Sequence, residues 1–172
     1  MDQFIYLDNA ATTALNKEVF EAIIPYFKEE YANPSSVYSF AQKSKAAVEK
    51  ARGIIAAAIG ASNQEIYFTA GGSEADNWAI KGVAEACKSK GKHIITSKIE
   101  HHGVLHTCQY LESQGFEVTY LDVDDKGMIR LEELEKAIRP DTILISIMFA
   151  NNEIGTIEPV EEIGKIAKKH KV

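Results

Sequence analysis

The stretch EIYFTAGGSE, residues 65–74, decides how this chain is expected to fold. A strand-like run, EIYFT, is followed by two adjacent glycines, Gly71 and Gly72, and then by an amphipathic helical pattern beginning near Ser73. The first backbone N–H groups of a helix have no partner within the helix, and the helix dipole places partial positive charge there. Because glycine lets a phosphate approach the backbone closely, this strand-turn-helix unit predicts an anion site.

The same residues have a simpler interpretation. Ser73 stands at the expected N-cap, and Asp76 three positions later would complete a capping box that only starts the helix. The string matches neither the GxxxxGK phosphate loop nor the GxGxxG dinucleotide motif. Taken alone, the helix start is the better interpretation, and phosphate binding needs support from other residues.

The composition indicates one globular domain with a sizeable core. The chain has 172 residues, of which 45% are hydrophobic and 26% charged. A net charge of -6 and the lack of an extended basic stripe argue against a nucleic-acid or anionic-membrane partner. The sequence contains no run of eighteen apolar residues, and the start MDQFIYLDN has no apolar export signal. We therefore expect a cytoplasmic protein without a membrane span.

Neither the cysteines nor the adjacent histidines predict a metal or redox site. Cys87 and Cys108 are far apart, form no CxxC pair, and both fall inside helical patterns, where core packing explains them. His101 and His102 are neighbours whose side chains point in different directions, without surrounding ligands at zinc-like spacing. We expect no metal, and a structural role for at least one of these histidines.

Strand-like and helix-like segments alternate along the chain, which is typical of an α/β domain with a mostly parallel sheet. The run TILISIMFA, residues 142–150, is the clearest candidate for a buried central strand. The expected helices are 17–29, a longer one ending at Ile59, and four that begin near Ser73, His102, Leu131 and Val160; the expected strands are 66–69, 94–97, 117–121 and 142–149.

Three polar groups follow closely on the ends of expected strands, namely Gly72 with Ser73, His101, and Asn151 with Asn152. Ligands of open α/β sheets bind outside the carboxyl ends of the strands, so these groups meet at one rim if their strands are neighbours. A ligand touching all three would have a phosphate, a flat ring and a polar atom. Pyridoxal 5'-phosphate (PLP) fits this description.

Six motifs carry a resemblance that extends over essentially the whole chain. They are YLDNAATT at 6–13, NPSS at 33–36, FTAGGSEADN at 68–77, ITSKIEHHGVL at 95–105, FEVTYLDVD at 116–124 and ANNEIG at 150–155. Together they resemble the cysteine desulfurases of iron-sulfur cluster assembly and nitrogen fixation, within the class V aminotransferase family. The resemblance implies the N-terminal part of the large domain of a fold-type-I PLP-dependent transferase, with a mostly parallel sheet flanked by helices. Residues 1–14 would form an N-terminal segment and residues 15–172 an incomplete PLP-binding large domain.

The resemblance also assigns roles to residues of this sequence. Gly72 and Ser73 would bind the cofactor phosphate, His101 would stack on the pyridine ring and transfer a proton, and Asn152 would bond near the phenolate oxygen. One departure is Phe149, where many relatives have histidine.

The implied reaction of the whole enzyme converts L-cysteine to L-alanine and an enzyme-bound persulfide, whose sulfur goes to an iron-sulfur scaffold or another acceptor protein. The family is homodimeric. The family's aspartate that pairs with the pyridine nitrogen, its Schiff-base lysine and its sulfur-accepting cysteine would follow Val172. We therefore expect residues 1–172 alone to be inactive. Two alternatives stay open: a stand-alone PLP or phosphate binder, and a non-catalytic dimerisation scaffold.

Overall fold

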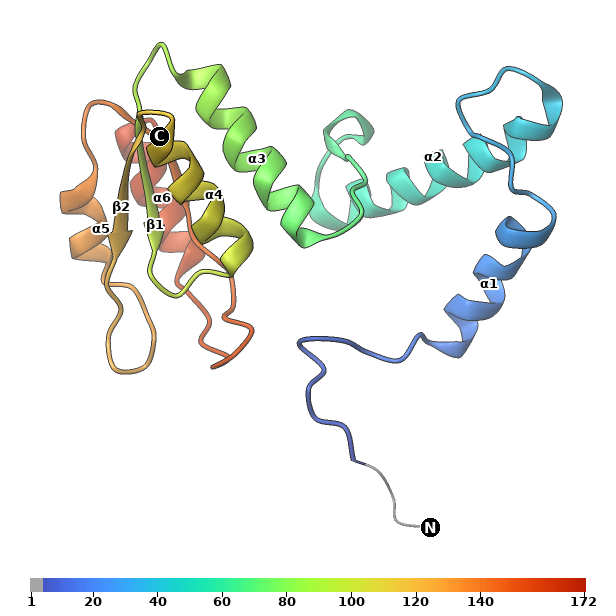
Figure 1. The fold of residues 1–172 in the computed structure, drawn as a ribbon, viewed down its shortest axis with the longest axis horizontal. Helices are drawn as coiled ribbons and strands as arrows, with labels where there is room; N and C mark the ends of the chain where they lie inside the picture. The colour runs from blue at the N-terminus through green and yellow to red at the C-terminus, as the bar shows by residue number, and fades with distance from the viewer. Residues whose placement is uncertain (1–4) are drawn as a thin grey trace. The chain divides into compact units, whose positions relative to one another are not determined.

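A computed structural model describes residues 5–172 of the chain (Figure 1). The chain divides into two compact units, Met1–Phe68 and Thr69–Val172, which we call unit 1 and unit 2. Along the described residues, no helix is both long enough and apolar enough to cross a membrane. All four residues to which the sequence assigns a ligand contact, Gly72, Ser73, His101 and Asn152, belong to unit 2.

The described residues of unit 1, 5–68, form two α-helices and a short 3-10 helix. Helix α1 spans Lys17–Lys28, α2 spans Ser39–Ile59 and η1 spans Asn63–Glu65. The side-chain oxygen of Asn16 caps α1 by accepting a hydrogen bond from the backbone N of Glu18 at 2.8 Å. Gly60 ends α2 in the left-handed conformation, with φ of 69°. The two helices expected in this region are confirmed.

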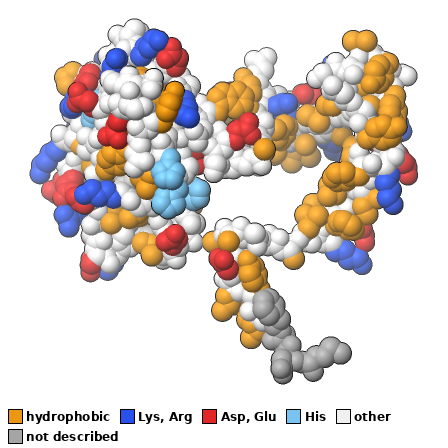
Figure 2. Space-filling view, viewed as in Figure 1, with side chains coloured by type: hydrophobic (Ala, Val, Ile, Leu, Met, Phe, Trp, Pro, Cys, Tyr) orange, Lys and Arg blue, Asp and Glu red, His pale blue; other side chains and the backbone are white. Residues whose placement is uncertain are grey.

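Unit 1 buries little apolar surface within itself. Among residues 5–68, the buried apolar side chains are the small ones of Ala32, Ala41 and Ala56. Large apolar side chains stay exposed on and between α1 and α2, including Phe27 at 77% and Val37 at 95% (Figure 2). An exposed apolar surface of this extent is typical of a segment that packs against further protein.

Unit 2 is an α/β/α sandwich around a parallel three-stranded sheet. Its elements are α3 (Gly72–Cys87), β1 (His93–Ser97), α4 (His102–Ser113), β2 (Glu117–Leu121), α5 (Leu131–Ala137), β3 (Thr142–Ser146) and α6 (Val160–His170). The strand order is β2-β1-β3, so β1 is central, and it is buried along its whole length. Both neighbouring strands run parallel to β1, which confirms the α/β class and the parallel sheet.

Side chains that alternate along β1 pack into two separate hydrophobic cores. Ile94 faces one core, with Ile80 of α3 and Cys108 of α4. Ile95 faces the other, with Leu134 of α5 and Ile163 of α6. Successive residues of a strand point to opposite faces, so two adjacent isoleucines are what a strand covered by helices on both sides requires.

A buried histidine joins the three strands at their amino ends. The ring of His93 forms hydrogen bonds with the hydroxyls of Thr142 in β3 at 2.7 Å and Thr119 in β2 at 2.8 Å. Burial lowers the pKa of His93, and the nearby Arg139 lowers it further. This end of the sheet is therefore held by a neutral imidazole.

Two expectations about strands are wrong. Residues 66–69 are not a strand, since they pair with no other strand in the described chain, and the carbonyl of Ile66 accepts a hydrogen bond from the Arg52 side chain instead. The expected central strand is β3, which lies at the edge of the sheet and ends at Ser146. It ends early because the backbone N–H of Met148 donates to the carboxylate of Glu100 rather than to a strand.

The expected starts of the helices at His102, Leu131 and Val160 are confirmed. The division of the chain at residue 14 and the extent of a large domain over residues 15–172 stay predictions, and the first four residues lie outside the described part.

Candidate functional site

The loops that follow β1 and β3 are tied together at the carboxyl ends of these strands. The Oε1 atom of Glu100 accepts hydrogen bonds from the backbone N of Met148 at 2.8 Å and from the hydroxyl of Ser97 at 3.1 Å. Glu100 is only 7% exposed, and burial raises the pKa of its carboxyl group, although these hydrogen bonds oppose the shift. Glu100 therefore acts as a buried clamp between two loops.

Asn151 forms a second connection between the same loops. Its side-chain nitrogen donates to the carbonyl oxygen of Ile99 at 2.9 Å. Its side-chain oxygen accepts from the backbone N of Glu153 at 2.8 Å and of Ile154 at 3.0 Å. Because Asn151 is buried and its amide is committed on both sides, it positions the loop and has little capacity left for a ligand.

Asn152 is the member of the pair with a free side chain. It is exposed, and its side chain forms no hydrogen bond to any other described residue. An amide in this state is available to a ligand. The two adjacent asparagines thus divide into one residue that shapes the loop and one that is presented at the rim.

The glycine turn begins α3 differently from the sequence expectation. The N-cap is Gly71, and it makes no side-chain cap, so Ser73 lies within the first turn. The carboxylate of Glu74, in the first turn, accepts a hydrogen bond from the backbone N of Ala70 at 2.7 Å, which gives a partner to a backbone N–H just before the helix. The expected capping box of Ser73 and Asp76 is therefore wrong, because two glycines let the helix begin before the serine.

This start leaves an open space with several hydrogen-bond donors. A side-chain carbon added at Gly71 or Gly72 would meet no atom within 4 Å. The hydroxyl of Ser73 has no hydrogen-bond partner among residues 5–172, and the first N–H groups of α3 have none within the helix. The space, the donors and the helix dipole together suit a phosphate group.

His101 lies next to Ser73, with Gly103 between them. His101 is the N-cap of α4, and its Nδ1 atom accepts a hydrogen bond from the backbone N of Gly103 at 3.0 Å. A side-chain carbon on Gly103 would lie 3.1 Å from His101 Nδ1 and 3.3 Å from Ser73 Oγ. Two of the predicted site residues, Ser73 and His101, therefore lie on either side of Gly103. Because Nδ1 accepts the hydrogen bond from Gly103, Nε2 is the free nitrogen of the His101 ring.

The helices that present these two residues are also joined directly. Helix α3 packs on α4 and on β3. The side-chain nitrogen of Asn77 donates to the carbonyl of Ser73 at 2.8 Å and lies 3.4 Å from the carbonyl of Gly103. The sequence did not single out Asn77, Glu100 or Gly103, because their partners are set by tertiary packing.

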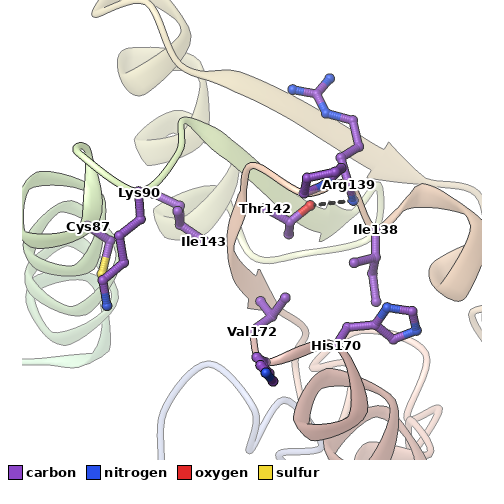
Figure 3. A pocket seen from close by; sticks show the side chains of 10 residues that line it. Cys87, Lys90, Ile138, Arg139, Thr142, Ile143, His170 and Val172 are labelled. Atoms are coloured by element: carbon purple, nitrogen blue, oxygen red, sulfur yellow. Dashed lines mark hydrogen bonds between the residues drawn. The ribbon is translucent and has the colours of Figure 1, made fainter.

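A cavity of about 700 Å³ lies at the opposite end of the sheet (Figure 3). Its wall includes Thr142, the first residue of β3, whose hydroxyl accepts a hydrogen bond from the backbone N of Arg139 at 2.8 Å. Lys90 and Lys171 add positive charge to the lining. The predicted rim residues do not line this cavity, so two separate places in unit 2 could receive an anion.

The cysteines differ in their surroundings. Cys108 is fully buried in the core between α3 and α4, and burial raises the pKa of its thiol to about 11. Core packing is thus confirmed for Cys108. Cys87 is half-buried and lines the cavity at the amino ends of the strands, so the core does not explain it.

Comparison with known proteins gives a consistent set of relatives. The family model for class V aminotransferases matches residues 5–172. A cysteine desulfurase IscS from Methanosarcina thermophila is 62% identical over 168 residues, which are 98% of this chain and 42% of that protein. A cysteine desulfurase IscS from Dictyoglomus turgidum is 58% identical over all of this chain and 44% of its own length.

Solved structures show the same relationship. A NifS-like protein superposes with a TM-score of 0.93 at 45% identity, covering 96% of this chain and 46% of that one. The structure described as SspA in complex with cysteine has a TM-score of 0.93 at 47% identity, covering 97% and 48%. The chain therefore spans less than half the length of the relatives that it matches.

Proposed function

The chain belongs to the class V aminotransferases, and we propose that it forms the N-terminal, cofactor-binding portion of a cysteine desulfurase similar to the relatives that it matches. The observation that carries this proposal is the meeting of Ser73 and His101 at Gly103, beside an open helix start. PLP has a phosphate group and a pyridine ring. The hydrogen-bond donors at the start of α3 suit the phosphate, and the neighbouring imidazole suits the ring.

Gly72 and Ser73 would hold the phosphate. The absence of a side chain at Gly72 leaves room for the phosphate oxygens, and the backbone N–H groups of the first turn donate to them. The hydroxyl of Ser73, which has no other partner in the described chain, supplies a further donor. Phosphate held in this way also gains from the dipole of α3.

His101 would lie against the ring of the cofactor and handle a proton. Because Nδ1 accepts from Gly103, a neutral ring in this orientation has its hydrogen on Nε2 and donates from there. Accepting a proton at Nδ1 would break this hydrogen bond and release the cap of α4. With its cap intact, His101 can therefore donate a hydrogen bond from Nε2, whereas taking up a proton at Nδ1 requires a local rearrangement that breaks the cap.

Asn152 would place its amide near the ring oxygen of the cofactor. Glu100 and Asn151 would fix the position of Asn152 indirectly, because both join the loop after β3 to the loop that contains His101. These two are positioning residues, since their side chains are directed into the protein.

When PLP is bound, its ring supplies the electron-withdrawing capacity that substrate deprotonation needs. The residues that the family uses to anchor the cofactor covalently and to accept sulfur have no counterpart among these 172 residues. We therefore propose that the 172-residue chain binds the cofactor but does not turn over L-cysteine by itself. In an enzyme of the relatives' length, sulfur from L-cysteine would pass through an enzyme persulfide to an iron-sulfur scaffold or another acceptor, in a cytoplasmic homodimer.

The test is a titration with pyridoxine 5'-phosphate, which lacks the aldehyde and so cannot react with surface lysines. We expect saturable binding that pyridoxine without phosphate does not show. Ser73→Ala should weaken it, whereas Ser89→Ala, just beyond the other end of the same helix, should not. Equal binding by both variants would refute the assignment.

The alternative of a dimerisation scaffold is favoured by one observation, the exposed apolar side chains of unit 1. It predicts concentration-dependent association in sedimentation experiments without any phosphate-dependent ligand binding. Association together with binding would fit the desulfurase portion, so the titration decides between the two.

A further inference from the structure

Two histidines lie one turn apart on the exposed side of α4. The rings of His102 and His106 are stacked, with centroids 5.2 Å apart and an interplanar angle of 26°. Both residues are exposed. Figure 2 shows a compact group of histidine side chains on this part of unit 2.

The nitrogens of both rings are free of competing contacts. Neither ring forms a hydrogen bond or an ion pair with any described residue; their recorded contacts are with neighbouring histidine rings. Residues four apart on a helix point to the same side, which is the arrangement by which two helical histidines bind one metal ion in HExxH sites. Binding one ion requires both rings to turn so that one nitrogen of each faces a common point.

We propose that His102 and His106 bind a single divalent transition-metal ion through one imidazole nitrogen each. Imidazole favours zinc, copper and nickel over magnesium and calcium, which prefer oxygen ligands. No group of three or more histidine, cysteine or acidic side chains that could hold a metal occurs within residues 5–172. Water would complete the coordination shell, and the ion would exchange readily, unlike a structural zinc with four protein ligands.

The site does not include His101. Its Nδ1 atom accepts from the backbone N of Gly103, its Nε2 atom is the one proposed above to donate in the cofactor site, and its ring centroid lies 6.4 Å from that of His102 at an interplanar angle of 60°. The metal site and the phosphate site are therefore neighbours with separate ligands. The sequence-based expectation of no metal considered His101 and His102 and overlooked His106, which is the residue at helical spacing.

The experiment is a calorimetric titration of the chain, prepared without a histidine tag, with Ni²⁺. We expect one equivalent to bind. His102→Gln and His106→Gln should each weaken affinity by about tenfold or more, because each removes a direct ligand. His170→Gln is the matched control, since this histidine belongs to α6, where it contacts Glu135. A His170→Gln protein that loses Ni²⁺ binding, or a His106→Gln protein that keeps it, would overturn the proposal.

Two further measurements separate this site from the cofactor site. Octahedral Ni²⁺ is paramagnetic, so the ring protons of His102 and His106 should broaden first in the NMR spectrum. His101→Gln and Ser73→Ala should both leave Ni²⁺ affinity within about twofold, a change of less than 0.5 kcal/mol. Loss of binding in His101→Gln would replace the two-histidine site by one that includes His101, and would contradict the assignment made here.

Discussion

The side-chain nitrogen of Asn151 donates a hydrogen bond to the carbonyl oxygen of Ile99 at 2.9 Å, across 52 residues of sequence. This contact joins the loop that presents Asn152 to the loop that presents His101. It exists because β1 and β3 are adjacent parallel strands whose carboxyl ends lie at one edge of the sheet. Two residues of the proposed site thus owe their positions to a neighbour that would not itself touch the ligand.

Substitution of the two adjacent asparagines should have very different effects on stability. Asn151→Ala leaves the part-buried carbonyl of Ile99 and two backbone N–H groups without partners, so we expect it to lower the free energy of unfolding by about 1–3 kcal/mol. Asn152→Ala removes an exposed side chain and should change stability by less than about 0.5 kcal/mol. Urea unfolding followed by the fluorescence of Trp78, the chain's single tryptophan, checks both. A larger loss in Asn152→Ala would show that the roles are reversed.

Gly103→Ala should damage ligand binding without unfolding the protein. The new carbon would lie 3.1 Å from His101 Nδ1 and 3.3 Å from Ser73 Oγ, so one of these side chains must move. Alanine is favoured over glycine in a helix by up to about 1 kcal/mol, which offsets part of the crowding. We expect several-fold weaker binding of pyridoxine 5'-phosphate.

The matched control for this change is Gly164→Ala in α6, where the added carbon would meet no atom within 4 Å. It should stabilise unit 2 slightly and leave ligand binding unchanged. If Gly103→Ala bound the ligand as well as the unaltered chain does, the space between His101 and Ser73 would not matter to the site.

The buried His93 should make stability depend on pH. Its pKa in the folded protein is lowered from the ordinary value of 6.5, mainly by burial. The unfolded chain therefore binds the proton more tightly, and the stabilisation present above pH 6.5 is lost as the pH falls below it. For a single proton the slope reaches at most about 1.4 kcal/mol per pH unit.

Unfolding curves of the unaltered chain and of His93→Gln between pH 5 and 7.5 measure this contribution as a difference. The variant should lose less stability on acidification. If the variant does not fold, the NMR titration of the His93 ring gives the answer directly, and a ring that becomes protonated at or above pH 6.5 in the folded protein would contradict the expected shift.

The two cysteines should differ in reactivity. Burial raises the pKa of Cys108 to about 11, so little thiolate is present at pH 8 and access is blocked. Cys87 is half-buried at the wall of the cavity. We expect a thiol reagent to modify Cys87 first and Cys108 only on unfolding, which mass spectrometry of the labelled peptides would show. Equal labelling rates in the folded chain would be inconsistent with this core.

The sequence predicted those features that depend on local pattern. Apolar spacing and polar starts located the helices at His102, Leu131 and Val160, and the motifs identified the family. The pattern could not place residues 66–69, because a strand exists only when another strand bonds to it. For the same reason the apolar run after Thr142 suggested a central strand, although β1 is the only strand with which β3 pairs in the described chain.

The positioning residues lay beyond sequence reasoning for a related cause. Glu100 reads as an ordinary charged residue, and only the pairing of β1 with β3 brings the backbone N of Met148, 48 residues later, to its carboxylate. Likewise, the N-cap at Gly71 depends on where Glu74 finds its partner. Residue type and spacing thus predict which groups would touch a ligand, and only the packing shows which residues hold those groups in place.

The most direct test of the cofactor cradle is to map where the phosphate of pyridoxine 5'-phosphate binds, using backbone amide NMR shifts with pyridoxine as the control. We expect saturating, phosphate-dependent shifts at the amides of Gly72 and Ser73, with smaller ones near His101. Shifts that cluster instead at Lys90, Arg139 and Lys171 would place the phosphate in the cavity at the amino ends of the strands and would contradict the assignment to α3.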